Sequence, residues 1–173
     1  MLSCLILFPF LSAILAFLPV RNQYRLYLLG AVSLTHAVAV ATFWWKHPPA
    51  EWNGFLVLDP LGLILLSICS FLYVSVAVFM VGYFEHEQRS NRTFVACLLF
   101  LLSAMSLVAV SYHMGLLWVA IETTTLFSAP LISFHSNRQT LEATWKYLII
   151  CSVGIALALM GTFFLGIAAY EVH

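Results

Sequence analysis

Apolar residues run through this chain in six long stretches, and the short segments between them hold most of the charges. Each stretch approaches or exceeds the roughly 20 residues that a helix needs to cross the hydrocarbon core of a bilayer. The stretches occupy about residues 2–20, 26–45, 60–83, 93–110, 115–135 and 141–170. The pattern predicts an all-α membrane protein, with a bundle of six transmembrane helices forming one domain over residues 1–173.

Composition supports a membrane location and limits the classes of partner that we expect. Charged residues are 8% of the chain and the mean hydropathy is +1.01, whereas soluble domains carry about 25% charged residues. So few charges cannot cover a water-facing surface. The formal net charge of zero gives no basic surface for nucleic acid, so we expect membrane lipid and no nucleic acid as a partner.

The first stretch has no positively charged leader, and Arg21 follows it directly. It is also longer than the apolar region of a signal peptide. We therefore expect this stretch to be retained as a helix rather than cleaved.

Positive charges are distributed unevenly between the two sides of the predicted bundle. With alternating spans, one side holds Arg21, Arg25, Arg89, Arg92, Arg138 and the inner-end Lys146, whereas the other side holds only Lys46. Cytoplasmic connections carry the excess of Lys and Arg. The bias predicts that both termini face away from the cytoplasm.

Cysteine and histidine spacing does not favour a metal centre. Cys4, Cys69, Cys97 and Cys151 lie in different spans, without the paired spacing of a zinc site or an iron–sulfur cluster. No pair of histidines has the helical spacing of metal ligands. We expect the four cysteines to be buried small hydrophobic residues, and we predict neither a metal nor a cofactor.

His36 lies near the middle of the second span, after Ser33 and Thr35. A polar ring at that depth needs a hydrogen bond inside the bundle or a path for water. Two interpretations are open: a satisfied imidazole bonded to a neighbouring helix, or a proton relay.

Glu122 lies in the fifth span, within the segment LWVAIETTTLFSAP over residues 117–130. A carboxylate at that depth costs about 2.5 kcal/mol or more on insertion scales, so it needs a partner, a proton or a function. The hydroxyls that follow it can bond back to the helix, cross to a neighbour or hold water; they belong to Thr123, Thr124, Thr125 and Ser128. Pro130 removes a backbone hydrogen bond and should kink or loosen the helix. These features favour a hydrated proton site, and the alternative is a structural carboxylate held by a cation or kept protonated.

Lys146 lies two turns into the sixth span. Thr140 is a candidate N-cap for this span, and Glu142 lies between the two residues. Lys146 can be a packing residue or a proton relay. Glu122 and Lys146 differ in depth by roughly 12 Å at the helical rise per residue. We therefore expect Lys146 to pair with Glu142, four residues before it. Glu122 should instead face water, hydroxyls or a group on another helix or chain.

Small residues recur later in the sixth span, at Gly154, Ala158 and Gly161. A stripe of small residues lets another helix approach closely. The alternative interpretation is that these small residues occur by chance in an apolar helix. Replacing Gly154 by Leu is expected to weaken assembly if the stripe is used.

Four segments together resemble the antiporter-like membrane subunits of respiratory complex I and the energy-converting hydrogenases. They are LDPL at 58–61, GYFEHE at 82–87, LWVAIETTTLFSAP at 117–130 and EATWKYLIICSVGIALALMGTFFLG at 142–166. Within that family, the chain is most similar to the component F group of hydrogenase-4. The resemblance covers the whole chain but only the first portion of such a subunit, which is a bundle of about fourteen helices with two inverted repeats.

The resemblance assigns roles to two residues. Glu122 matches a mid-membrane Glu that modulates a neighbouring protonatable lysine, and Lys146 matches a lysine near the start of the following helix. The family's further lysines and broken helices would lie beyond His173. The resemblance therefore implies a fragment, or a split subunit whose remaining helices come from another chain.

The function implied is a proton-translocating membrane subunit, or its N-terminal portion, in a membrane-bound hydrogenase or NADH dehydrogenase-like complex of a bacterial or archaeal inner membrane. Redox chemistry would occur in other subunits, so the chain is at most a non-catalytic membrane subunit. Two alternatives remain open: a non-transporting scaffold or assembly subunit, and a small channel or transporter that works as an oligomer. The sequence does not distinguish proton from sodium.

Overall fold

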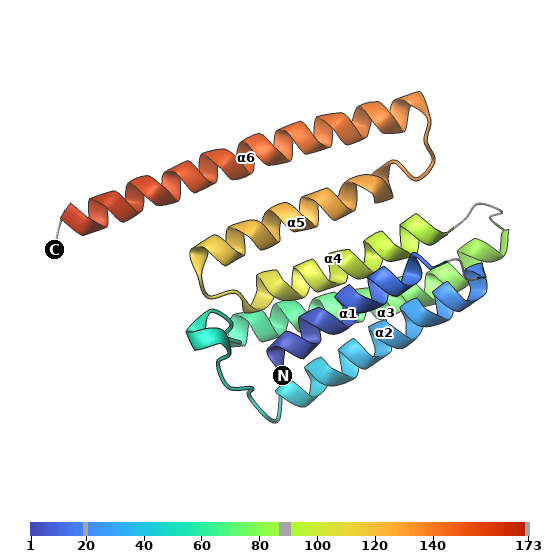
Figure 1. Cartoon of the computed structure of the whole chain (residues 1–173), viewed down its shortest axis with the longest axis horizontal. Coiled ribbons are helices and arrows are strands. Elements are labelled where there is room, and N and C mark those ends of the chain that lie inside the picture. The colour runs from blue at the N-terminus through green and yellow to red at the C-terminus, as the bar shows by residue number, and fades with distance from the viewer. Residues whose placement is uncertain (19–20, 87–90, 172–173) are drawn as a thin grey trace.

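The computed structural model describes residues 1–18, 21–86 and 91–171, and almost all of these residues are helical. The helices are α1 (Leu2–Ala16), α2 (Asn22–Phe43), α3 (Pro60–His86), α4 (Arg92–Val110), α5 (Met114–Ile132) and α6 (Arg138–Glu171), with a short 3-10 turn, η1 (Trp52–Gly54), between α2 and α3. Figure 1 shows them running back and forth along one axis. The predicted all-α membrane fold is confirmed.

The expected span lengths hold for five of the six helices in the described ranges. Helices α2 to α6 are long and apolar enough to cross a membrane. Helix α1 has 15 residues, or roughly 22 Å at the helical rise per residue, which is short of the roughly 30 Å hydrocarbon core. It ends at Ala16, where the sequence predicted a span to residue 20; residues 19–20 lie outside the described part.

The start of α6 also differs from the expectation, because Asn137 caps this helix in place of Thr140. The Asn137 side chain accepts a hydrogen bond from the Thr140 backbone N–H at 2.8 Å, and the Thr140 hydroxyl accepts one from the Asn137 N–H at 3.0 Å. Asn is a stronger N-cap than Thr, and the reciprocal pair satisfies two backbone donors that the first turn leaves free. The helix therefore begins at Arg138 rather than near residue 141.

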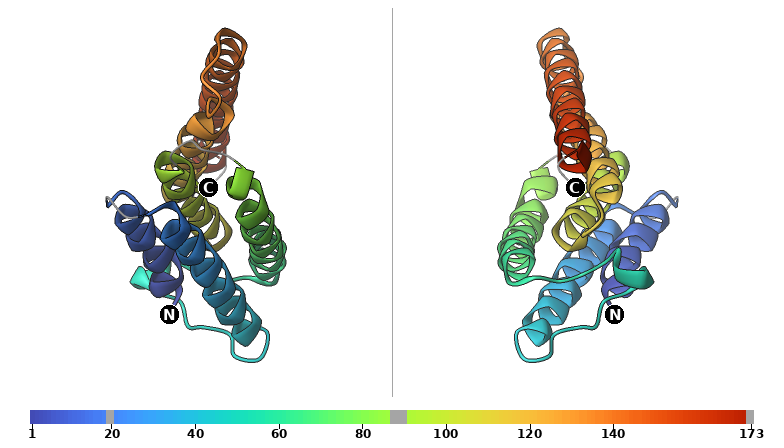
Figure 2. Two further views of the ribbon diagram at one scale, coloured as in Figure 1. Left: turned by 90° about the vertical axis from the view of Figure 1, so that its right-hand side faces the viewer. Right: turned by 90° about the vertical axis from the view of Figure 1, so that its left-hand side faces the viewer.

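Helix α4 is the centre of the bundle. It contacts α1, α2, α3 and α5, and Figure 2 shows α1, α2 and α3 grouped around it. One core cluster includes Leu29, Val95 and Leu99, and a second includes Leu2, Leu66 and Val110 at the end where α1 begins. The fully buried side chains are thus concentrated in α1 to α4.

The arginines of the described ranges gather at one end of the bundle. Arg21, Arg92 and Arg138 stand at the starts of α2, α4 and α6, which Figure 1 places at the same end. Arg25 is buried there. It donates to the Ala16 and Leu18 carbonyls at 3.0 and 2.9 Å and to the Asn91 side chain at 3.3 Å, so it ties the end of α1 to the start of α4. Arg89, counted with them in the sequence, lies outside the described residues.

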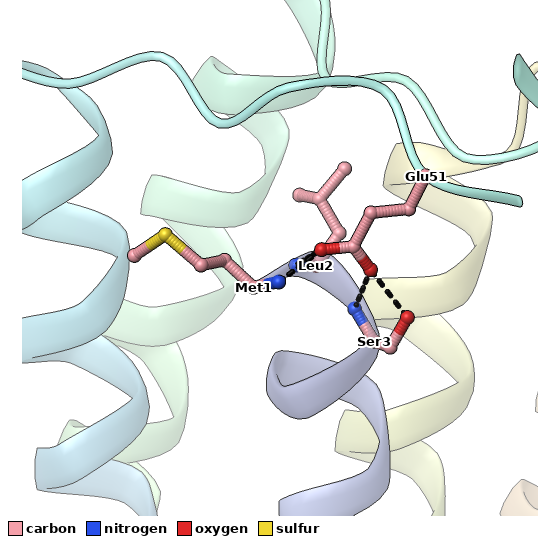
Figure 3. Close-up of polar contacts among 4 residues, drawn as sticks. All are labelled: Met1, Leu2, Ser3 and Glu51. Atoms are coloured by element: carbon pink, nitrogen blue, oxygen red, sulfur yellow. Dashed lines mark hydrogen bonds and ion pairs between the residues drawn. The ribbon is translucent and has the colours of Figure 1, made fainter.

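Glu51 holds the opposite end of the bundle together (Figure 3). Its carboxylate accepts hydrogen bonds from the backbone N–H groups of Leu2 and Ser3 at 3.1 and 2.9 Å, and it also contacts the Met1 ammonium and the Ser3 hydroxyl. These donors, above all the ammonium, lower the pKa of Glu51 to about 2. The segment between α2 and α3 is thereby fixed to the start of α1.

The cysteines differ from the expectation of uniform burial. Cys97 is buried, Cys69 and Cys151 are half-buried, and Cys4 is exposed on α1. The prediction for Cys4 is wrong because an apolar helix can present small residues on its outer surface, and lipid replaces a protein core there.

Candidate functional site

Glu122 lies on α5, in the contact between α5 and α6. Its side chain is half-buried, and its Oε1 accepts a hydrogen bond from the Ser152 hydroxyl of α6 at 3.2 Å. Within the described residues, no Lys or Arg lies at ion-pair distance from this carboxylate. Glu122 therefore faces a hydroxyl on another helix, which is one of the surroundings that the sequence predicted.

The four hydroxyls that follow Glu122 on α5 all bond back to their own helix. Each donates to a backbone carbonyl three or four residues earlier, at 2.7 to 2.8 Å; the donors are Thr123, Thr124, Thr125 and Ser128. Such bonds satisfy a hydroxyl inside an apolar helix at little cost. Of the possibilities left open by the sequence, back-bonding is the one that these four residues share.

Ser128 also contacts α6. Its Oγ lies 2.7 Å from the Tyr147 hydroxyl. The Glu122–Ser152 and Ser128–Tyr147 contacts together form a polar seam, a name we keep for these four residues. The sequence did not single out Tyr147 or Ser152. Both lie within the segment 142–166 that resembles the family, but their pairing with α5 depends on how the two helices are rotated against each other.

Trp118 lies one turn before Glu122, on the same face of α5. Its indole Nε1 atom is buried and has no hydrogen-bond partner in the described part of the chain. A buried donor without a partner is uncommon in folded proteins. The neighbourhood of Glu122 therefore includes an indole N–H that finds no hydrogen-bond acceptor on α5 or α6.

Pro130 stands in the last turn of α5, and the helix ends two residues later, at Ile132. The sequence predicted a span to residue 135. Pro130 supplies no backbone donor, so the Leu126 carbonyl one turn earlier lacks its helical hydrogen bond. In addition, the Ser133 hydroxyl bonds the carbonyls of Ala129 and Pro130 at 3.2 and 3.4 Å. Pro130 thus lies close to where α5 ends.

Lys146 pairs with Glu142 and not with Glu122, as the sequence predicted. The pair is on the outer surface of α6, with the two side chains 68% and 62% exposed. Exposed pairs of this spacing contribute little to stability. The structure thus places Lys146 apart from the polar seam.

His36 is at the junction of α2, α3 and α4. The ring is 2% exposed, and its Nδ1 and Nε2 lie 2.8 Å from Ser70 Oγ and 2.9 Å from Ser106 Oγ. The Ser106 hydroxyl donates to the Leu102 carbonyl at 2.8 Å, so it must accept from the ring. This assigns the ring proton to Nε2, and Nδ1 then accepts from Ser70.

The His36 network is a complete set of hydrogen bonds for a neutral ring, which is the arrangement of a satisfied imidazole. It is also separate from Glu122, because α2 and α5 are not in contact. The sequence could place His36 inside the bundle, but not Ser70 and Ser106 beside it, since they come from two later helices.

No group of three His, Cys, Asp or Glu side chains that could hold a metal ion occurs in the ranges that the structure describes.

Relatives of three kinds are similar to this chain. A hydrogenase-4 component F homolog of Methylacidiphilum infernorum is 33% identical over 176 residues, covering 96% of this chain and 36% of that protein. NADH-quinone oxidoreductase subunit N 2 of Aquifex aeolicus is 25% identical over 122 residues, covering 70% of this chain and 25% of that protein. Na(+)/H(+) antiporter subunit A1 of Staphylococcus aureus is 32% identical over 147 residues, covering 83% of this chain and 18% of that protein. The chain belongs to the antiporter-like family.

The resemblance inferred from the four segments is therefore confirmed, and the chain is an integral membrane protein of this antiporter-like family. It spans between 18% and 36% of the length of these curated relatives. No protein-family model matches the chain.

Proposed function

We propose that this chain is a proton-translocating, antiporter-like membrane module that works with other membrane subunits of a hydrogenase or complex I-like assembly. Electron transfer would take place in those subunits, and the helices absent from this chain would come from the rest of the same subunit or from another chain. The observation that carries the proposal is Glu122, a mid-helix carboxylate that meets a hydroxyl and no cation among the described residues, in a chain related to antiporter subunits.

Glu122 is the proposed proton-binding group. The polar seam supports this role, because it brings hydroxyls and a carboxylate together across two apolar helices. A carboxylate is costly to place inside a membrane, so its presence there favours a function. The nearby hydroxyls of Thr123, Thr124 and Thr125 keep the helix polar around Glu122.

Lys146 and His36 are proposed as accessory proton-transfer residues. Lys146 is exposed near the start of α6, where water can exchange protons with its pair partner Glu142. A relay through His36 has a hydroxyl on each side of the ring, but it requires the Ser106 hydroxyl to turn away from the Leu102 carbonyl.

We further propose that the arginine-rich end of the bundle faces the cytoplasm of a bacterial or archaeal cell, with both termini on the opposite side of the inner membrane. The charge bias supports this orientation. Thiol labelling of single-cysteine variants at positions 23 and 50 should occur from opposite sides, and labelling from one side would exclude this orientation.

A scaffold role is the second candidate, and the completed hydrogen bonds around His36 favour it. The two functions differ in what Glu122→Gln does in vesicles from cells that contain the whole assembly. If Glu122 binds the proton, this variant assembles normally and loses substrate-driven proton uptake, whereas Glu122→Asp, which keeps a carboxylate at the same position, retains it. Normal uptake in Glu122→Gln vesicles would refute the transport proposal and leave the scaffold role.

A further inference from the structure

A groove of about 610 Å³ opens on the surface at the end of the bundle opposite the arginines. One wall is the segment Trp52–Phe55 between α2 and α3, and the other is the first turns of α5. Its lining includes the polar side chains of Asn53 and His113 and, further along α5, the apolar Leu116 and Val119. The groove is thus polar at the end of the spans and apolar along α5.

The backbone of the first wall is in an unfavourable conformation. Trp52 and Asn53 have φ of 54° and 53°, in the left-handed region, and Gly54 follows with φ of 91°. A bulky residue in that region is an outlier that persists only where the surroundings enforce it, and such positions cluster at binding sites. Here the conformation leaves the Trp52 side chain 65% exposed beside the groove.

The surroundings that enforce this conformation are identifiable. Glu51, just before the turn, is bonded to the start of α1. After the turn, the Phe55 carbonyl accepts from the Tyr112 N–H at 3.0 Å, and the Val57 N–H donates to the Val110 carbonyl at 2.9 Å. Because both flanks are fixed, Trp52 and Asn53 are presented rigidly rather than on a loose loop.

His113 lines the groove and has a ring proton that it can donate. Its Nδ1 accepts the Gly115 backbone N–H at 3.2 Å, so the proton of the neutral ring is on Nε2. The ring also stacks on Phe55, with centroids 4.7 Å apart. These two contacts hold the imidazole in place and leave Nε2–H to bond a ligand oxygen.

The depth of the groove matches the boundary between lipid headgroups and acyl chains. Val119 lies five residues into α5, or roughly 7.5 Å from its start, and that boundary layer extends about 5–10 Å. Exposed Trp44 and Trp45 flank the same end of the bundle, and the exposed Lys46 complements a lipid phosphate. Trp side chains favour this layer because they have an apolar ring and a polar N–H.

We propose that this groove binds one phospholipid, with the headgroup at Asn53 and His113, an acyl chain against Leu116 and Val119, and Trp52 at the level of the glycerol. The site is distinct from the polar seam and does not depend on the proton-transfer proposal.

The test uses the full chain in nanodiscs of phosphatidylglycerol and phosphatidylcholine whose acyl chains carry bromine either near the headgroup or near the chain end. The four other tryptophans are replaced by Phe, so that the fluorescence comes from Trp52. Bromine near the headgroup should quench Trp52 severalfold more than bromine near the chain end. Val119→Phe, which fills the groove, should remove most of this quenching, whereas Val38→Phe, at a similarly exposed site on α2, should not.

A second variant tests the headgroup contact. His113→Asn keeps a residue that can cap α5 but removes the Nε2–H donor, so phosphatidylglycerol retained through purification should fall severalfold by mass spectrometry. Quenching of Trp52 by aqueous acrylamide without quenching by bromine would overturn the proposal. Equal bromine quenching in Val119→Phe and Val38→Phe would also overturn it. Protection of Trp52 from both bromine and acrylamide would overturn it too, because the groove would then be covered by protein.

Discussion

The first four helices and the last two are built from similarly apolar residues but are packed differently. Helices α1 to α4 bury fully enclosed side chains and complete the hydrogen bonds of His36 and Arg25 internally. Helix α6 contacts only α5 among the described helices, and none of its described side chains is buried. The candidate proton site lies in this second region. The difference indicates that the bundle is complete around α4, whereas the outer face of α6 is free for lipid or protein.

Core truncation should give the largest difference between the two regions. Leu99 of α4 is fully buried, so Leu99→Ala should lower the free energy of unfolding by roughly 2–5 kcal/mol. Leu157 of α6 is 59% exposed, and Leu157→Ala should change it by less than about 0.5 kcal/mol. Unfolding of both variants in detergent micelles measures the difference, and equal losses would show that α6 is packed as tightly as α4.

The sequence did not predict this division, although it predicted the helices and two of the buried polar residues. Hydropathy and length located the helices, because the demands of the bilayer act on each segment separately. Glu122 and His36 were identified because a polar side chain within an apolar span is costly whatever the neighbouring helices are. Their partners Ser152, Ser70 and Ser106 were not, since a single serine in an apolar helix is common and its contacts depend on how helices far apart in sequence are rotated. The end of α1 was missed because apolar residues continue after the helix stops at Ala16.

Glycine substitutions give an intermediate effect and sharpen the same comparison. A Cβ added at Gly62 of α3 would lie 2.3 Å from the Ala109 carbonyl oxygen, so Gly62→Ala should cost roughly 1–3 kcal/mol. Gly154 of α6 has open space around it, so Gly154→Leu should not destabilise the chain. It should instead reduce the yield of the assembled complex if another helix packs on the small-residue stripe. Normal complex yield for Gly154→Leu would count against use of the stripe.

The pH dependence of stability should come from the end of the bundle that Glu51 holds together. The pKa of Glu51 is lowered to about 2 in the fold, against about 4.3 for an unperturbed Glu. Its stabilising contribution is therefore complete above the unfolded value and is lost as the pH falls toward 2. The wild type should exceed Glu51→Gln in thermal stability by a constant margin between about pH 5 and pH 7, and the margin should shrink toward zero as the pH falls through 2.

Glu142→Gln in the exposed pair of α6 is the matched control for that experiment and should leave stability nearly unchanged. A margin between wild type and Glu51→Gln that stays the same down to pH 2 would contradict the role assigned to the Glu51 carboxylate.

The most direct test is photo-cross-linking from α6 in native membranes, because the proposed proton site needs other protein helices to complete the region that holds Glu122. A photoreactive residue at position 157 should yield a discrete adduct with another polypeptide or with further helices of the same subunit. The same residue at position 71, on the exposed outer face of α3, should yield mainly lipid adducts. Only lipid adducts from position 157 would contradict the account, because Glu122 would then have no protein partner beyond Ser152.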